Sequence, residues 1–204
     1  MLSLILLGLS SNLTAPTLSR DKILEIGSGL AQLRIDGNVA AELDLILSPE
    51  GKPLRCKILR SKGNSKMAEA ICPTLMQMKM LKPAEADGGR AYGRLRYIFQ
   101  AGTRRIDLGL KANPDMELFV ANLPGENENQ LDVPVSVYID GEGRVADCQG
   151  SSAQSSPYAD VACQQVRGQA FTRLYDKDSV PVSYVEELLI RFSIQAPDAP
   201  NAET

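Results

Sequence analysis

Hydrophobic and polar side chains alternate along two separate stretches of the chain, and each stretch opens the same series of patterns. In the first, the alternation over 41–47 predicts a half-buried strand, and Gly51 lies in the turn that follows. Apolar residues within 54–59 predict a strand that returns from this turn. Asn64 then precedes apolar residues at helical spacing, and 92–100 predicts a closing strand. The first stretch therefore predicts a hairpin, a helix and a closing strand.

The second stretch has the same order of patterns. A strand is predicted over 133–139, a turn at Gly143 and a returning strand over 144–149. Pro157 stands at the first position of a predicted helix, where its missing N–H has no cost. A closing strand falls within 182–194. The chain thus contains the same supersecondary unit twice.

Matched residues of the two units have a nearly constant separation. Gly51 and Gly143 are 92 residues apart. The cysteines match at separations of 92 and 91 residues: Cys56 with Cys148, and Cys72 with Cys163. A repeat of this kind indicates two copies of one unit, each with its own cysteine pair.

We therefore expect an α+β fold of two tandem two-layer domains. Each would be a small antiparallel sheet with one main helix packed on it, in the order β-β-α-β. The units would span 21–108 and 109–195, and 196–204 has the composition of a disordered tail. A further extended segment is predicted before each hairpin, at 30–36 and 116–122.

The N-terminal residues 1–20 have the character of a signal-like or leader segment. Their apolar run, 2–9, is much shorter than the roughly 20 residues that span a bilayer. It resembles the end of a signal-peptide apolar region, but no basic residues precede it. The alternative interpretation is an apolar first strand.

The four cysteines all fall inside the repeats, which favours two disulfides and an oxidising compartment. One cysteine of each pair lies on the second hairpin strand and the other on the helix, so a disulfide would join helix to sheet. Closing a loop of about 15 residues stabilises a protein by about 3 kcal/mol. Buried free thiols and a four-cysteine metal site are the alternatives, although zinc ligands are usually much closer in sequence.

Several kinds of catalysis are excluded or disfavoured. The chain has no histidine, which excludes Ser–His and Cys–His nucleophile pairs, and it has no Gly-rich phosphate loop. Glu186 and Glu187 are adjacent on a predicted strand and so face opposite sides. Neither cysteine pair is C-x-x-C. We expect no enzymatic activity, no cofactor and no metal.

Charge is divided unevenly along the chain. Residues 1–106 hold 16 Lys and Arg against 9 Asp and Glu, a net charge of +7, whereas 107–204 hold 6 against 16, a net charge of −10. Two ordinary solvated surfaces would explain this. So would docking of the units on each other or on a second copy as a homodimer, or separate partners of opposite charge. Nucleic acid fits poorly, because aromatic residues do not alternate with Lys and Arg on a strand.

The order of motifs resembles the C-terminal domain of TonB, the periplasmic energy transducer that contacts outer-membrane receptors. The first unit matches it with Gly51-Lys52-Pro53, Ser61-Lys62-Gly63, Met67 with Ala70, and Leu81-Lys82-Pro83-Ala84. The second matches it with Gly143-Arg144-Val145, Ser151-Ser152-Ala153, Tyr158 with Val161, and Phe171-Thr172-Arg173-Leu174. The resemblance covers about 130 residues of the two units.

The resemblance implies a periplasmic binding module for a protein partner of the cell envelope. Such domains bind an extended receptor segment by adding it to a sheet edge. The candidate edges are the closing strands, and the candidate binding residues are Arg94, Arg96, Tyr97 and Arg191. The alternative role of these arginines is to protect an exposed edge from aggregation. The family's membrane helix and Pro-rich spacer are missing from this sequence, so an envelope interaction protein without receptor coupling is the alternative function.

Overall fold

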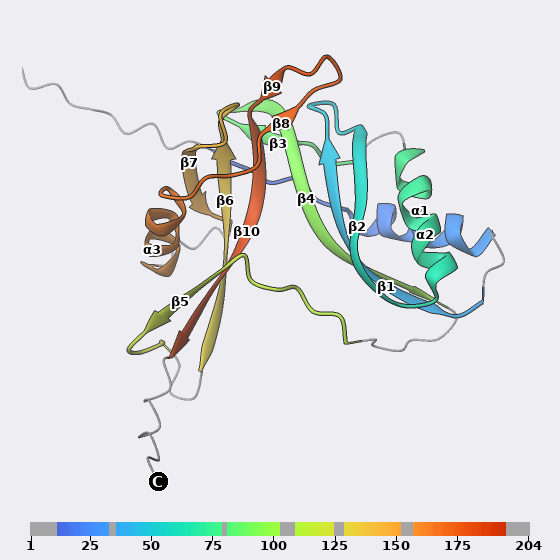
Figure 1. Ribbon diagram of the computed structural model, residues 1–204, viewed down its shortest axis with the longest axis horizontal. Coiled ribbons are helices and arrows are strands. Elements are labelled where there is room, and N and C mark those ends of the chain that lie inside the picture. The colour runs from blue at the N-terminus through green and yellow to red at the C-terminus, as the bar shows by residue number, and fades with distance from the viewer. Residues whose placement is uncertain are drawn as a thin grey trace, which may run out of the picture.

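The computed structural model describes residues 12–32, 36–78, 81–102, 109–124, 129–151 and 157–194. Within these ranges the chain forms three helices and ten strands (Figure 1). In chain order they are α1 (Arg20–Gln32), β1 (Asn38–Leu47), β2 (Pro53–Gly63), α2 (Ser65–Met76), β3 (Ala84–Ala86), β4 (Gly89–Gly102), β5 (Met116–Val120), β6 (Gln130–Ile139), β7 (Val145–Gly150), α3 (Pro157–Val166), β8 (Leu174–Tyr175), β9 (Pro181–Val182) and β10 (Tyr184–Ile194). The predicted tail, 196–204, lies outside the described residues.

One mixed sheet of eight strands organises the molecule. Its order is β2-β1-β4-β10-β6-β7, while β3 pairs with β4 and β5 pairs with β10. The first repeat supplies β1, β2 and β4, and the second supplies β6, β7 and β10. The hairpin and closing strands of each repeat pair antiparallel, whereas β5 pairs with β10 in parallel, and β4 and β10 run parallel where the repeats meet.

The predicted fold class is therefore wrong, because the repeats do not form two separate small sheets. Tyr92 of β4 lies opposite Tyr184 of β10, and Arg94 lies opposite Glu186, so the sheet continues from one repeat into the other. This pairing gives each closing strand a hydrogen-bonded neighbour on its second edge, which would otherwise be exposed. It also leaves Tyr184 and Val185 fully buried. Each repeat thus completes the other.

Within each repeat the predicted hairpin and helix are present. Leu45 of β1 lies opposite Cys56 of β2, and Val137 of β6 lies opposite Cys148 of β7, so both hairpins have the same register. The helix α2 begins after Asn64, whose side chain accepts a hydrogen bond from the Met67 N–H at 3.1 Å. These elements follow from local patterns, and the sequence predicts them correctly.

The two helices that carry a cysteine pack on opposite faces of the sheet. Leu45 belongs to a core with α1 and α2, and Val137 belongs to a second core with α3. Neighbouring side chains of a strand point to opposite faces, so the register at the β4–β10 pair places the two cores on opposite sides. Ile46 of β1 also packs into the second core. The strand β1 therefore contributes to both cores.

The matched glycines have the same structural role. Gly51 and Gly143 have positive φ angles of 77° and 84°, and each donates and accepts in a tight turn between hairpin strands. The carbonyl of Gly51 accepts from Leu81 at 2.9 Å, and that of Gly143 accepts from Phe171 at 2.8 Å. A Cβ at Gly51 would lie 2.1 Å from the Leu81 carbonyl oxygen. Both positions therefore require glycine.

The extended segment predicted at 30–36 is wrong in its first part, because Leu30 is in α1. Ile26 and Leu30, one helical turn apart, are buried against α2. Gly29 lowers helix propensity, but a Cβ there would lie 2.9 Å from the Thr74 side chain. Gly29 is therefore explained by the close packing of α1 on α2, and its low helix propensity is the reason why the sequence did not predict α1. The second predicted segment, 116–122, is confirmed over β5.

The described part of the predicted leader, 12–19, packs against both repeats. Leu13 and Ala15 are buried, and Thr14 pairs with Glu85 of β3. The side chain of Gln149 on β7 donates a hydrogen bond to the Leu13 carbonyl. This segment therefore covers the sheet where the two repeats join.

Candidate functional site

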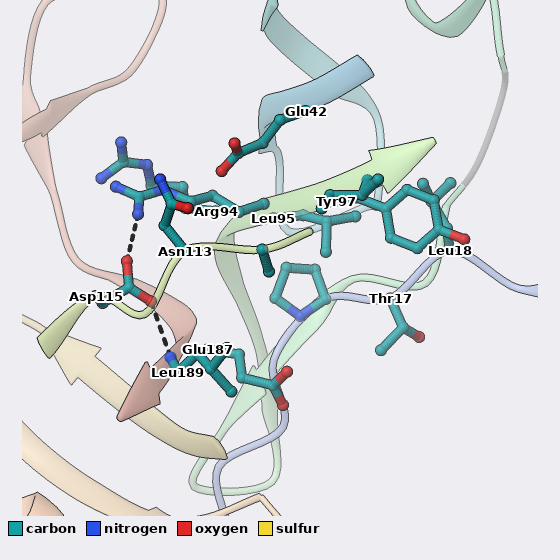
Figure 2. Close-up of a pocket in the computed structure, with 14 residues that line it drawn as sticks. Thr17, Leu18, Glu42, Arg94, Leu95, Tyr97, Asn113, Asp115, Glu187 and Leu189 are labelled. Atoms are coloured by element: carbon teal, nitrogen blue, oxygen red, sulfur yellow. Dashed lines mark hydrogen bonds and ion pairs between the residues drawn. The ribbon is translucent and has the colours of Figure 1, made fainter. Parts of the chain in front are cut away.

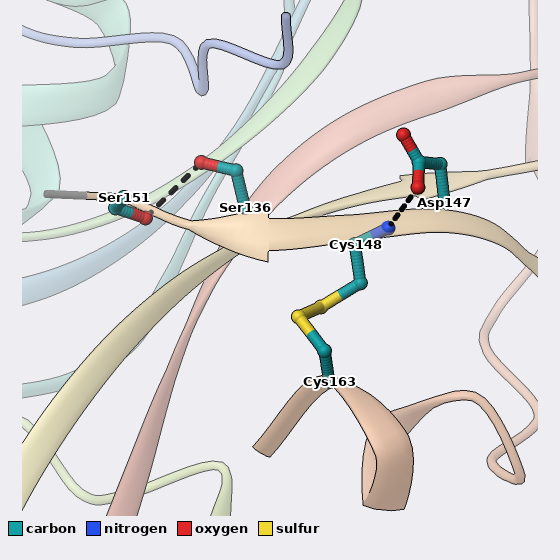
Figure 3. The surroundings of a disulfide bond; sticks show 5 residues. All are labelled: Ser136, Asp147, Cys148, Ser151 and Cys163. Atoms are coloured by element: carbon teal, nitrogen blue, oxygen red, sulfur yellow. Dashed lines mark hydrogen bonds between the residues drawn. A yellow bond between two sulfur atoms is a disulfide. The ribbon is translucent and has the colours of Figure 1, made fainter. Parts of the chain in front are cut away.

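Both predicted disulfides are present. Cys56 is joined to Cys72 and Cys148 to Cys163, each with 5.5 Å between the Cα atoms. Figure 3 shows the second bond joining β7 to α3. No free cysteine remains among the described residues. The free-thiol and metal interpretations are therefore wrong, and the disulfides indicate an oxidising, extracytoplasmic environment.

None of the helices in the described ranges is long and apolar enough to cross a membrane. Across the same ranges, no three or more Cys, Asp or Glu side chains are grouped so that they could hold a metal ion.

Of the two closing strands predicted as binding edges, only part of β4 has an unpaired edge. The closing strand β10 pairs with β6 on one side and with β4 and then β5 on the other, so the prediction that it is an edge is wrong. The closing strand β4 pairs with β1 along 93–102. On its other side it pairs with β10 only at 92–94. Within the described part of the chain, no strand pairs with the second edge of 95–102.

β4 and β10 diverge after their short parallel pairing, as Figure 1 shows. Asp115 fixes the start of β5 against β10 at this point. Its N–H donates to the Leu189 carbonyl, and its Oδ2 accepts from the Leu189 N–H, both at 2.8 Å. β5 then takes the place beside β10 that β4 has left. We call the unpaired second edge of 95–102 the open edge.

A cavity of about 410 Å³ lies along the beginning of the open edge (Figure 2). We call it the edge cavity. Apolar side chains from four segments contribute to its lining. The lining residues are Pro16, Thr17, Leu18, Glu42, Arg94, Leu95, Arg96, Tyr97, Ile98, Ala112, Asn113, Asp115, Glu187 and Leu189.

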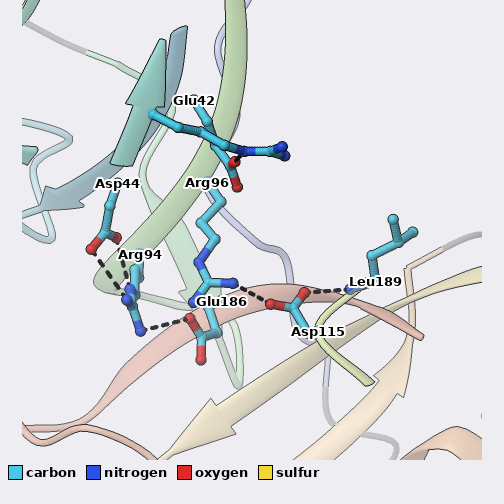
Figure 4. Close-up of polar contacts among 8 residues, drawn as sticks. Glu42, Asp44, Arg94, Arg96, Asp115, Glu186 and Leu189 are labelled. Carbon is cyan, nitrogen blue, oxygen red and sulfur yellow. Dashed lines mark hydrogen bonds and ion pairs between the residues drawn. The ribbon is translucent and has the colours of Figure 1, made fainter. Parts of the chain in front are cut away.

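Five charged residues meet where the strands diverge, and we call them the junction cluster: Asp44, Arg94, Arg96, Asp115 and Glu186. Arg94 donates two hydrogen bonds to Asp44, at 2.8 and 3.1 Å, and its Nη1 lies 3.5 Å from Glu186 Oε2. Arg96 binds Asp115, which in turn binds the Leu189 N–H (Figure 4). The cluster thus connects β1, β4, β10 and the segment before β5.

A second cavity, of about 260 Å³, lies beside the same cluster and is called the inner cavity. It shares Arg94, Arg96 and Asp115 with the edge cavity. Its other lining residues are Met116, Gln169, Ala170, Phe171, Thr172, Glu186, Leu188 and Ile190. Glu186 and Leu188 point to one face of β10, whereas Glu187 and Leu189 of the edge cavity point to the other.

The electrostatics of the cluster centre on Glu186. Burial raises the pKa of this carboxyl to about 7, against the lowering effect of Arg94 and Arg96. The pKa of Arg94 is raised by its hydrogen bonds to Asp44 and by the charge of Glu186, which outweigh its own burial. Burial also raises the pKa of Tyr97. Arg94 therefore remains charged, while Glu186 changes protonation state near neutral pH.

Three of the four predicted binding residues meet at the site, since Arg94, Arg96 and Tyr97 all line the edge cavity. Arg191 lies elsewhere and donates to Asp132 at 2.7 and 2.8 Å. Both arginines of β4 form ion pairs at the junction, and their alternative role, protection of an exposed edge, stays a prediction.

Sequence reasoning missed the three carboxylates of the junction cluster. Asp44 occupies a polar position of the alternation over 41–47 and therefore gives no signal, whereas Glu186 stands in a mainly apolar strand. Asp115 is brought to Arg96 only by the tertiary fold.

No protein-family model, curated protein or solved structure matches this chain. The site must therefore be interpreted from its own geometry.

Proposed function

We propose that the protein is a periplasmic binding module that captures an extended segment of a cell-envelope protein by strand addition to the open edge. The observation that carries this proposal is the stretch 95–102 of β4, which pairs with β1 on one side and with no described strand on the other. Extended peptides bind such edges through main-chain hydrogen bonds, and neighbouring pockets provide specificity.

The edge cavity supports this function because it provides such a pocket. Leu95, Tyr97 and Leu189 surround a volume of about 410 Å³, which is large enough for an apolar side chain of a bound segment. Tyr97 is half-buried and offers both an apolar ring and a hydroxyl group. A partner would therefore gain main-chain pairing and apolar burial at one place.

The segment 109–115 runs from β2 to the beginning of the open edge and is held by side chains. Arg60 donates to the Lys111 carbonyl, Lys62 donates to that of Gly109 at 3.4 Å, and Arg96 binds Asp115. Exposed side-chain contacts of this kind are weaker than a continuous strand pairing. We therefore expect an incoming strand to loosen this segment when it pairs with β4.

The compartment and the kind of partner rest on two further arguments. The disulfides indicate an extracytoplasmic environment, which includes the periplasm. The resemblance to the TonB C-terminal domain supports a periplasmic segment of an outer-membrane receptor as the partner. The more specific proposal is that this binding couples the protein to transport through the receptor.

The test uses the oxidised full chain, immobilised and exposed to detergent-solubilised outer membrane of the source organism. Captured proteins are identified by mass spectrometry, and amide hydrogen exchange of β4 is measured with and without the purified partner. Tyr97→Asp places a charge in the edge cavity and should abolish capture. Glu69→Gln, on an exposed position of α2, is the matched control and should leave capture unchanged.

Capture of a TonB-dependent receptor together with slower exchange in 95–102 supports the proposal. If only soluble envelope proteins are captured and exchange in 95–102 is again slower, strand addition is supported and receptor coupling is contradicted. Binding that leaves exchange in 95–102 unchanged would show that the open edge is not the site.

A further inference from the structure

The inner cavity is lined by a largely buried carboxylate, Glu186, that accepts no hydrogen bond from the described residues. The side chain of Glu186 is 4% exposed, and its ion pair within the described residues is with Arg94 Nη1 at 3.5 Å. This distance is longer than a charge-assisted hydrogen bond. Among the described residues, no donor makes a hydrogen bond to either Glu186 oxygen. A buried carboxylate normally accepts several such bonds, so this one is available to a ligand.

The other carboxylates of the junction cluster are already occupied. Both oxygens of Asp44 accept hydrogen bonds from Arg94. Asp115 accepts from Arg96 with one oxygen and from the Leu189 N–H with the other. Glu186 is therefore the member of the cluster that is able to accept further donors.

The charge of the cluster favours a cation. Arg94 and Arg96 provide two positive charges, while the three carboxylates provide three negative charges when Glu186 is ionised. One further positive charge would balance the site. The loop residues that line the inner cavity, Gln169–Thr172 in sequence, are uncharged and leave this balance unchanged.

The two cavities suit neighbouring residues of one extended segment. Adjacent side chains of a strand point to opposite faces of a sheet. The inner cavity is bounded by Glu186 and Leu188, and the edge cavity by Glu187 and Leu189, on the opposite face of β10. A strand beside β4 would therefore direct alternate side chains into the two cavities.

We infer that the segment bound at the open edge carries a lysine or arginine whose cationic group enters the inner cavity and pairs with Glu186, next to an apolar residue that fills the edge cavity. This inference rests on the proposed strand addition and names the chemistry of its partner. The Glu186 carboxylate supplies the acceptors, and the cation supplies the missing donors and charge.

The pairing depends on pH. Arg94 and Arg96 from β4, Asp44 from β1, Asp115 before β5 and Tyr184 on β10 are the charged or titratable groups around Glu186. Because burial raises the Glu186 pKa to about 7, the carboxylate is mostly protonated at pH 6 and mostly ionised at pH 8. The cationic segment should therefore bind more tightly at pH 8 than at pH 6.

The test begins with a displayed library of random nine-residue peptides, selected on the oxidised full chain at pH 8. We expect the selected peptides to share a Lys or Arg beside an apolar residue. The best peptide is then synthesised, together with a version in which norleucine replaces the cationic residue. Fluorescence anisotropy gives the Kd of each peptide at pH 6 and pH 8.

Glu186→Gln removes the charge and keeps the shape of the side chain. It should weaken the cationic peptide at least about tenfold at pH 8 and leave the norleucine peptide unchanged. Glu186→Leu is a second variant with the same expectation, and Glu69→Gln is the control that should change neither peptide. Urea unfolding of each variant confirms that the fold is retained.

The outcomes separate the two proposals. Selected peptides that protect 95–102 from hydrogen exchange but share no cationic residue would overturn this inference and leave strand addition intact. Equal loss of both peptides in Glu186→Gln would also overturn it, because the effect would then be structural. A library that returns no peptide, or only peptides that leave 95–102 unprotected, would overturn strand addition and the inference together.

Discussion

The two repeats have the same hairpin, helix, disulfide and glycine turn, yet their closing strands place different residues opposite one matched position of the first hairpin strand. Leu95 lies opposite Leu45 in the first repeat, and Glu186 lies opposite Val137 in the second. Leu45 and Val137 are themselves matched, 92 residues apart. A partly buried leucine in one repeat is thus a buried glutamate in the other. The hairpin, helix and disulfide form the core of each repeat, whereas Glu186, which replaces the leucine, lies where the two repeats meet.

This difference explains the arrangement of the junction. Glu186 faces Arg94 of the other repeat, and Arg94 also binds Asp44 of its own repeat. Buried ion pairs contribute little net stability compared with apolar packing, but removing one partner is costly. The charged residues at the junction therefore define how the halves meet and what the site binds, more than how stable the molecule is.

The largest expected effect comes from removing the shared cation. Arg94→Met leaves Asp44 and Glu186 buried without their positive partner. We expect the free energy of unfolding to fall by about 3–5 kcal/mol. Urea unfolding at pH 8 measures this, and a loss below about 1 kcal/mol would show that the junction does not depend on the ion pairs.

The disulfides provide a direct comparison of the two repeats. They close loops of 16 and 15 residues, so the chain-entropy model gives each about 3 kcal/mol. Replacing Cys56 and Cys72 by alanine, or Cys148 and Cys163, should lower the Tm by roughly 6–12 °C in either case. Calorimetry of the two double variants checks this. A much larger effect in one repeat would mean that the repeats are not equally dependent on their disulfides.

The pH dependence of stability should come from the second repeat. The Glu186 pKa is raised from its ordinary value of 4.5 to about 7 in the folded protein, so the folded state binds more protons than the unfolded state between these values. Its contribution to stability is present below pH 4.5 and is lost as the pH rises through 7. The loss is about 3 kcal/mol at most. Unfolding free energies measured from pH 5 to pH 8 should decline in the wild type.

The control for this prediction is Glu186→Leu, which gives the second repeat the residue of the first. Its unfolding free energy should be nearly constant from pH 5 to pH 8, because the titrating group is gone. An unchanged decline in this variant would assign the effect to another group.

The smallest effect is expected for the arginine pair outside the junction. Arg191 binds Asp132 with two hydrogen bonds, as Arg94 binds Asp44, but Asp132 is 41% exposed in its side chain. Exposed pairs of this kind contribute less than about 1 kcal/mol. Arg191→Met should therefore change the urea midpoint only slightly, and an effect as large as that of Arg94→Met would contradict the distinction between the two pairs.

The sequence predicted the parts of the site that depend on local patterns. Arg94, Arg96 and Tyr97 were candidates because the resemblance made their closing strand a candidate binding edge, and all three line the edge cavity. Asp115 could not be identified, since nothing in its neighbourhood indicates that it binds a strand 19 residues earlier in the chain. Arg191 has the same pattern as the others but lies outside the site.

By itself, the sequence determined the repeat, the hairpins, the position of the helices α2 and α3 and the cysteine pairs. Alternation, helical spacing, turn glycines and matched separations are local properties, and each element follows from its own residues. Only the tertiary structure decided that β4 and β10 pair in parallel, that the helices lie on opposite faces, and that Glu186 meets Arg94. Strand pairing between distant segments depends on which edges remain unsatisfied after each half has formed, and no local pattern contains that information.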